Sequence, residues 1–393
     1  MPQPPTLNAD PHARREEFLL LALACAAFWN IYITQPVLPR IETAFSVDTG
    51  RAAWTVSLVL LGFALANLPL GYLADRFGGH RLFAAGGAGV ALCGFVAART
   101  DSFDMLVSAR FVQGLLLPAL TTCAAAALSR MVPSARLNLV MGRYVAATVL
   151  GGLLGRLLGG LMPGADGWRL AFLIAGFVVF AAALSAARHA PRDLPMRVTA
   201  DAPGYGELLR RRDLWLLWLL GGLGQAIFAP VFNTLPYRLA ETPFALRPDQ
   251  STWLYLSYVI GIVAGPVAGR LSQRYSNGRV MITASLVLML SLCSLLLPSL
   301  LAVSLALLGI SAGFFGLHAA AVGALNLRLQ GAQGRANALY VLSYYLGAAF
   351  GVLWSAWVYQ TQGWNTLVTV AMGLTLLPVL IGLHERRRAG APG

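Results

Sequence analysis

The sequence contains no lysine and few acidic residues. All 29 basic residues are arginine, against 16 aspartates and glutamates, and only 11% of the chain is charged. A soluble protein ordinarily carries charge on about a quarter of its residues. With 57% hydrophobic residues and a mean hydropathy of +0.66, the composition excludes an ordinary soluble domain and indicates a membrane protein.

Further absences narrow the class of function. The four cysteines lie singly within apolar runs, so we expect no disulfide framework and no redox pair. No phosphate-binding GxxxxGK[ST] motif occurs, which argues against direct use of ATP by this chain. The apolar runs show neither a nucleophile with a base nor a cluster of metal ligands. We therefore expect no intramembrane enzyme, no cofactor and no metal site.

The apolar residues gather in long runs, each close to the roughly 20 residues that a helix needs to cross a bilayer. Strict alternation of apolar and polar residues is absent, so we expect helices rather than a closed barrel. Twelve membrane-spanning helices are predicted, at residues 18–41, 52–74, 82–98, 103–129, 137–162, 168–187, 213–237, 251–270, 280–297, 302–327, 336–359 and 364–384.

The distribution of arginine between these spans orients the chain. If the N-terminus is cytoplasmic, the connections on that side receive 21 arginines and those on the other side receive 6. Such an excess is typical of cytoplasmic loops. Both termini are therefore predicted to be cytoplasmic. Because the membrane accounts for the basic composition, no nucleic-acid partner is expected.

One long connection, residues 188–212, is rich in proline and charge and lies near the middle of the chain. We interpret it as a cytoplasmic linker between an N-terminal six-helix half, residues 1–187, and a C-terminal six-helix half, residues 213–393. Its segment GELLRRR is open to two interpretations, a short helix on the membrane surface or a solvated tether.

The two halves contain a weak internal repeat. A shift of 198 residues places Gly71, Leu73, Arg76 and Arg81 on Gly269, Leu271, Arg274 and Arg279, and a shift of 196 places Gly151 and Gly155 on Gly347 and Gly351. Because the repeated unit has an even number of spans, its copies run parallel through the membrane. Such repeats are typical of two-halved secondary transporters, in which the substrate path lies between the halves.

Several motifs carry a resemblance to a known family. GYLADRFGGHRL, from Gly71, resembles the loop 2–3 signature of the Major Facilitator Superfamily, and RFVQG, from Arg110, resembles its span-four signature. GGLLGRLLGG, from Gly151, resembles the span-five signature of the antiporter branch, with Arg156 where that pattern has proline. Together with TQPVLP in span one, the chain looks similar to bacterial inner-membrane efflux carriers of the drug/proton antiporter-like, YnfM-type branch.

The resemblance implies an all-α integral membrane protein with twelve transmembrane helices in two parallel six-helix halves. It implies secondary active transport of a small organic solute by alternating access, with export and proton coupling as the expected mode. The expected partners are the substrate, the lipid bilayer and protons, and the expected form is a monomer in the bacterial inner (plasma) membrane. The alternatives are an uptake carrier or uniporter of the same fold and a non-transporting membrane sensor.

Residues of two motifs are expected to control gating. Asp75 ends span two at the predicted cytoplasmic face, where a carboxylate can bind arginines and helix N-termini of neighbouring spans and hold that face closed. Arg76 and Arg81 have a second interpretation, because loop arginines also set orientation. The other gating candidates are Gly71, Gly78, Gly151 and Gly155. Glycines recur every four residues from Gly151, which suits both close helix packing and a pivot.

Two arginines inside predicted spans, Arg110 and Arg156, are the strongest functional signal, because charge within a membrane is costly. No acidic residue lies near a span centre, so a fixed ion pair is not expected. Three interpretations stay open. Both arginines bind an anionic group of the substrate through their forked donors, Arg110 serves ion coupling by lowering the pKa of a neighbour, or both bond main-chain carbonyls exposed by the glycine-rich span five.

The remaining substrate-binding candidates are side chains near the centres of spans, where amides and tyrosines suit recognition of an organic solute. They are Asn30, Gln35, Gln113, Gln225, Asn233, Tyr258, His318 and Tyr344. For each of them, ordinary hydrogen bonding between helices is the alternative. His318, the histidine clearly inside a span, is interpreted either as a proton carrier or as a neutral hydrogen-bonded residue.

Overall fold

The computed structural model describes residues 11–77, 79–132, 134–189, 203–329 and 333–389, and these contain helices but no strand. The first half comprises α1 (Pro11–Tyr32), η2 (Gln35–Val37), α2 (Leu38–Phe45), α3 (Thr49–Ala52), α4 (Trp54–Phe77), α5 (Gly79–Arg99), α6 (Phe103–Leu116), α7 (Pro118–Met131), α8 (Ser134–Leu161) and α9 (Gly167–His189). The rest comprises α10 (Tyr205–Arg210), α11 (Arg212–Ala240), α12 (Pro248–Ser251), η3 (Thr252–Val259), α13 (Ile260–Tyr275), α14 (Asn277–Ser294), α15 (Leu300–Leu327) and α16 (Gln333–Ala389).

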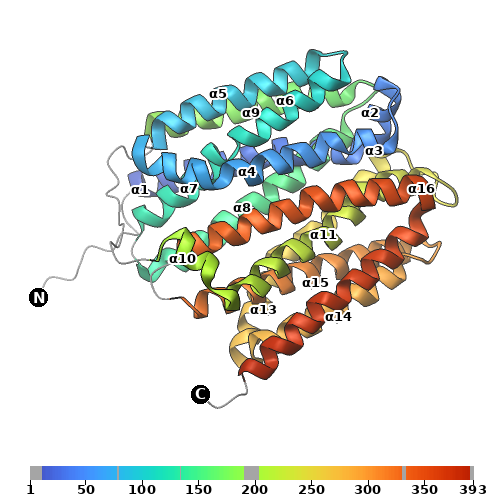
Figure 1. Ribbon diagram of the computed structural model, residues 1–393. Coiled ribbons are helices and arrows are strands. Elements are labelled where there is room, and N and C mark those ends of the chain that lie inside the picture. The colour runs from blue at the N-terminus through green and yellow to red at the C-terminus, as the bar shows by residue number, and fades with distance from the viewer. Residues whose placement is uncertain (1–10, 78, 133, 190–202, 330–332, 390–393) are drawn as a thin grey trace, which may run out of the picture.

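The long helices lie roughly along one common direction, with α1 to α9 on one side of the bundle and α11 to α16 on the other (Figure 1). Within the described residues, eleven helical segments are long and apolar enough to cross a membrane. One of them, α16, has 57 residues, which at 1.5 Å per residue would span nearly three times the roughly 30 Å hydrocarbon core.

The helix α16 folds back on itself at Gly363, where φ is 79° and ψ is −177°. That region of backbone conformation favours glycine. The segments 333–362 and 364–389 therefore cross separately, and the prediction of twelve spans is confirmed. As an even number requires, α1 begins and α16 ends at the same end of the bundle (Figure 1). We term this end the terminal face and the other end the opposite face.

Prolines break two of the spans into shorter helices. The α-helix of span one ends at Tyr32, four residues before Pro36, which has no N–H to bond the Tyr32 carbonyl. The chain continues through η2 into α2. Span four is interrupted where Pro118 begins α7. The break in span one leaves main-chain carbonyls without helical partners inside the bundle.

Glycines allow the same close helix contact in each half. Within α8, a Cβ on Gly151 or Gly155 would lie 2.2 Å from the Cys25 carbonyl oxygen or 2.3 Å from that of Trp29, both on α1. In α16, a Cβ on Gly347 would lie 2.1 Å from the Gly222 carbonyl oxygen on α11. Spans five and eleven thus pack on spans one and seven in the same way, as expected of two parallel repeats.

The predicted gating segment forms the junction between α4 and α5. Asp75 and Arg76 belong to the last turn of α4, but their side chains and the whole of Gly78 lie outside the described residues. Arg81 is exposed on α5, and Gly71 has room for a methyl group. In the linker, residues 190–202 are not described, whereas part of GELLRRR forms the short helix α10.

Candidate functional site

A cavity of about 590 Å³ lies between the two halves. It is bordered by α1, η2, α4, α7 and α8 of the first half and by α11, η3, α15 and α16 of the second. Its phenylalanine and tyrosine rings, here termed the aromatic lining, are those of Phe28, Tyr32, Phe63, Tyr144, Phe228, Tyr258, Phe315, Tyr344 and Tyr345. A mostly apolar cavity of this size with a few polar groups is suited to a small organic molecule.

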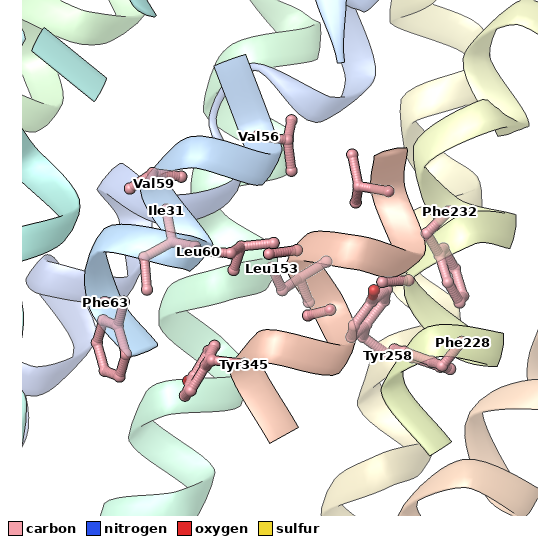
Figure 2. Packing of buried hydrophobic residues seen from close by; sticks show 14 of the residues in the cluster. Ile31, Val56, Val59, Leu60, Phe63, Leu153, Phe228, Phe232, Tyr258 and Tyr345 are labelled. Atoms are coloured by element: carbon pink, nitrogen blue, oxygen red, sulfur yellow. The ribbon is translucent and has the colours of Figure 1, made fainter. Parts of the chain in front are cut away.

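Rings from the two halves meet across this cavity. Phe63 of α4 and Tyr345 of α16 approach to 4.3 Å between ring centroids, and Figure 2 shows their side chains next to each other. On the other side of the view, Tyr258 lies beside Phe228, with 5.3 Å between centroids. Residues about 280 positions apart in the chain therefore form one continuous wall.

Among the described residues, the cavity is accessible from the terminal face. It reaches the exposed residues Ser129 and Gly334, near the end of α7 and the start of α16. Toward the opposite face the halves are joined, since the Gly50 N–H donates to Gln360 Oε1 at 3.2 Å. At a second contact between the halves, a Cβ on Gly160 would lie 1.8 Å from the Thr252 hydroxyl, so the end of α8 and the start of η3 are in close contact.

Arg156 lies at the closed end of the cavity with its guanidinium between two tyrosine rings. Its Cζ is 3.9 Å from the Tyr32 ring centroid and 4.1 Å from that of Tyr258. Its Nε donates to Gln35 Oε1 at 2.7 Å, Nη1 to the Gly152 carbonyl at 2.9 Å and Nη2 to the Tyr258 hydroxyl at 2.9 Å. The bond to Tyr258 joins the two halves.

Arg110 is fully buried in the first half and does not line the cavity. Its Nη1 and Nη2 donate to the carbonyls of Asn30 and Ile31 at 2.5 and 2.6 Å, and Nη1 also bonds Gln113 Oε1. Its Nε donates to the Thr55 carbonyl at 2.9 Å. Arg110 therefore supplies donors to the carbonyls at the end of α1 that the break at Pro36 leaves without helical partners.

The end of α1 also provides an electrostatic reason for Arg110. The C-terminus of a helix carries a partial negative charge, which stabilises a nearby cation. Among the described residues, neither Arg110 nor Arg156 has a carboxylate within ion-pair distance. The two arginines are thus held by different means, Arg110 by main-chain carbonyls and Arg156 mainly by side chains that face the cavity.

The structure separates the predicted substrate-binding residues into two groups. Those that line the cavity are Gln35, Arg156, Gln225, Tyr258, His318 and Tyr344. Those that do not are Asn30, Arg110, Gln113 and Asn233. Asn30 and Gln113 belong to the network around Arg110, because Gln113 Nε2 donates to Asn30 Oδ1 at 3.2 Å and to the Val90 carbonyl at 3.1 Å.

Three of the predicted residues lie together away from the cavity. Arg110, Asn30 and Gln113 are enclosed within the first half, and their polar groups are used by one another and by main-chain carbonyls. In this conformation none of the three lines the cavity. Asn233 is also buried outside the cavity, and its amide has no partner among the described residues.

His318 lies on the second-half wall of the cavity. Its Nδ1 is 3.0 Å from the Tyr340 hydroxyl, and its ring is 5.3 Å from that of Tyr344 between centroids. Sequence interpretation missed Tyr32 and Phe63. Tyr32 could have been found as a tyrosine near the predicted candidates Asn30 and Gln35 inside span one. An isolated phenylalanine in an apolar run gives no comparable signal.

Comparisons with known proteins agree with this architecture. The sequence model of the Major Facilitator Superfamily matches residues 20–242 and 230–392. The chain is 27% identical over 389 residues to "Inner membrane transport protein YnfM" of Escherichia coli (strain K12), covering 98% of this chain and 93% of that protein. It is 26% identical over 393 residues to "Uncharacterized MFS-type transporter YybF" of Bacillus subtilis (strain 168), covering 96% and 94%.

Two solved structures share the fold at low sequence identity. A bacterial homologue of the human lysosomal transporter Spinster, in an inward-facing and occupied conformation, superimposes with a TM-score of 0.80 at 13% identity, over 96% of this chain and 98% of that one. The nucleoside transporter NupG, in a mutant form, gives a TM-score of 0.77 at 12% identity, over 94% and 99%.

Proposed function

Because this chain belongs to the Major Facilitator Superfamily, we propose that it is a secondary active transporter that exports a small organic solute across the bacterial inner membrane. The observation that carries this proposal is the cavity between the halves, which reaches the terminal face and is closed at the opposite face. Alternating access requires such a one-sided cavity, and a rocking of the two halves would expose it to the other side.

The arginine distribution supports a cytoplasmic terminal face, because 21 arginines belong to connections on that side. The conformation is then inward-facing. Domain boundaries follow the proposed halves, residues 1–187 and 213–393 with the linker 188–212 between them. The protein acts as a monomer, since each chain supplies both walls of the cavity.

The chemistry of the cavity supports an anionic or carboxylate-bearing solute. Arg156 supplies positive charge at its closed end, and the described lining contains no carboxylate that would attract a cation. His318 is the proposed site of coupling to protons, because it is a titratable side chain that lines the same cavity. Gln35, Gln225, Tyr258 and Tyr344 add hydrogen-bonding groups around the solute.

Gating is proposed to use the junction between α4 and α5. In the outward-facing state, Asp75 would bind arginines or helix N-termini of neighbouring spans, with Gly71, Arg76, Gly78 and Arg81 shaping the junction. Asp75→Asn is then expected to impair transport while membrane insertion stays normal, as measured by flux and by the amount of protein in the membrane. Unchanged flux would remove this gating role.

The function itself is tested by solute flux in proteoliposomes that contain the purified chain alone. Export predicts that a solute supplied on the cytoplasmic side accumulates on the other side when a proton gradient is imposed. Movement only down the solute's own gradient would identify a uniporter, and accumulation in the reverse direction an uptake carrier. Failure to move any solute would leave a membrane sensor as the explanation.

A further inference from the structure

The charge of the cavity is the first constraint on its ligand. Among the described lining residues, Arg156 has the one permanently charged side chain. All three of its hydrogen-bond acceptors are neutral, the Gln35 amide, the Gly152 carbonyl and the Tyr258 hydroxyl. A buried cation without a counterion is unfavourable, and one negative charge on a ligand would balance it. On a ligand with two negative charges, the second charge would have no cationic partner among the described lining residues.

The free donors of Arg156 are the second constraint. A guanidinium has five N–H groups, and the three bonds use one on each nitrogen, so Nη1 and Nη2 keep one N–H each. The Tyr32 and Tyr258 rings pack against the guanidinium, with their centroids 3.9 and 4.1 Å from Cζ, and restrict how a ligand can approach it. Because residue 152 is a glycine, no side chain crowds Nη1. A Cβ at this position would lie only 3.2 Å from that nitrogen.

The aromatic lining is the third constraint, because nine phenylalanine and tyrosine rings border the cavity that contains Arg156. Its rings come from both halves, as in the pair Phe63 and Tyr345. Aromatic rings attract a flat ring by stacking and edge contacts that an aliphatic chain of equal volume does not make. The volume of about 590 Å³ accommodates a molecule of two or three fused rings.

From these constraints we infer that the cavity takes organic monoanions with a flat aromatic body. The anionic group accepts hydrogen bonds from the edge of Arg156, and the body lies against the aromatic lining. This inference rests on the proposed transport function and narrows its substrate class. Aromatic dianions, aromatic cations and neutral aromatic molecules are disfavoured because none of them balances a single buried positive charge.

Matched naphthalene compounds test the inference on the purified full-length chain. The probes are 2-naphthoate, naphthalene-2-carboxamide, naphthalene-2,6-dicarboxylate and 2-naphthylmethylammonium, with decanoate as the aliphatic monoanion, and affinity is measured by isothermal titration calorimetry. We expect 2-naphthoate to bind at least tenfold more tightly than each of the others. Equal affinity for the carboxamide, the dianion or decanoate overturns the proposal, as does the absence of binding by 2-naphthoate.

Variants assign the preference to Arg156. In Arg156→Gln we expect the advantage of 2-naphthoate over the carboxamide to disappear, while carboxamide binding persists and reports an intact cavity. Arg156→Lys should retain part of the charge preference but lose at least tenfold in 2-naphthoate affinity, because lysine lacks the forked donor edge. The exposed Arg99→Gln on α5 is the matched control and should retain the full preference.

Flux in proteoliposomes separates this inference from the proposed function. Transport of other solutes, without preference for 2-naphthoate, would overturn the substrate class and leave the transporter standing. Arg156-dependent binding of 2-naphthoate, without flux of any solute, would support the ligand class and overturn the transport function.

Discussion

Arg110 and Arg156 are two buried arginines on consecutive spans of the same half, and the structure gives them different surroundings. Arg110 makes four hydrogen bonds, three of them to main-chain carbonyls at the end of α1 and the start of α4. Arg156 makes three, two of them to side chains that line a cavity. A charge inside a span is therefore not by itself a binding site.

The two sites differ in which groups accept hydrogen bonds from the guanidinium N–H donors. At Arg110 the broken end of α1 supplies carbonyls and a favourable helix dipole, so the guanidinium is satisfied within the fold. At Arg156 the charge is screened by tyrosine rings but not balanced, and two N–H groups stay available. The surroundings of Arg110 satisfy its guanidinium within the fold. Arg156 has no carboxylate partner among the described residues, and under the proposal above the anionic group of a ligand balances its charge.

The largest expected effect is on stability, in Arg110→Lys. An ammonium group cannot reach the four acceptors that the planar fork serves, and each buried carbonyl left without a donor costs about 1–3 kcal/mol. We expect a loss of several kcal/mol, measured as a fall in the thermal unfolding midpoint in detergent. Arg156→Lys should lose clearly less, because its side-chain partners face a cavity. Equal losses would remove the distinction between the two sites.

The next effect concerns the contact that places Arg156. Gly155→Ala puts a Cβ 2.3 Å from the Trp29 carbonyl oxygen, and main-chain atoms cannot rotate away. Overpacking of this kind costs about 3 kcal/mol, and it would move α8 away from α1 together with Arg156. Gly142→Ala on the same helix is the control, because nothing lies within 4 Å of its Cβ. Unfolding midpoints and flux that are alike in both variants would argue against a role for this contact.

A smaller effect is expected from Tyr258→Phe, which keeps the ring over Arg156 and removes the hydroxyl. The lost hydrogen bond to a charged group across the halves is worth about 2 kcal/mol. The closed opposite face should therefore open more often. Spin labels placed at residues 49 and 361 report the distance between the halves at this face. In pulsed electron paramagnetic resonance, the distance distribution of the variant should contain a larger population of long distances. A distribution identical to that of the parent chain would show that this bond does not hold the halves together.

The smallest effect at constant pH is expected from His318→Gln. The amide preserves a hydrogen bond to Tyr340, so solute binding at constant pH should change little, but it cannot take up a proton. If His318 carries the coupling proton, the dependence of flux on external pH should flatten. If the pH dependence of flux in the variant equals that of the unchanged protein, His318 is a neutral hydrogen-bonded residue. Arg156 would then be the charged side chain among the described residues that line the cavity.

Much of the fold was predictable because membrane-spanning helices are defined by local hydropathy. The twelve spans, the even topology and the parallel repeat follow from runs of apolar residues and from motifs that the bilayer constrains directly. The interruption of span one at Pro36 was not predicted, because residues 18–41 were taken as one helix, although proline lacks the N–H that a continuous helix would need there. What the interruption does could not be predicted, because the carbonyls of Asn30 and Ile31 meet Arg110 only when spans one and four pack together.

The site was predicted less completely, for a related reason. The polar candidates were chosen by their depth within spans, and depth does not distinguish a cavity wall from the inside of one half. Gln35 and Gln113 are both amides inside spans, yet Gln35 bonds Arg156 at the cavity and Gln113 bonds Arg110 away from it. Phe63 and Tyr345 face each other because two helices from different halves cross there.

The sequence by itself determined that the chain is a two-halved helical membrane protein of this superfamily with two arginines inside its spans. These properties depend on composition and on neighbours along the chain, so they can be read without a structure. Only the tertiary structure decided which arginine lines the cavity between the halves. Arg156 donates hydrogen bonds to Gln35 and to Tyr258, which are both more than 100 residues away in the sequence. Which residues bond to each arginine therefore depends on how the helices pack.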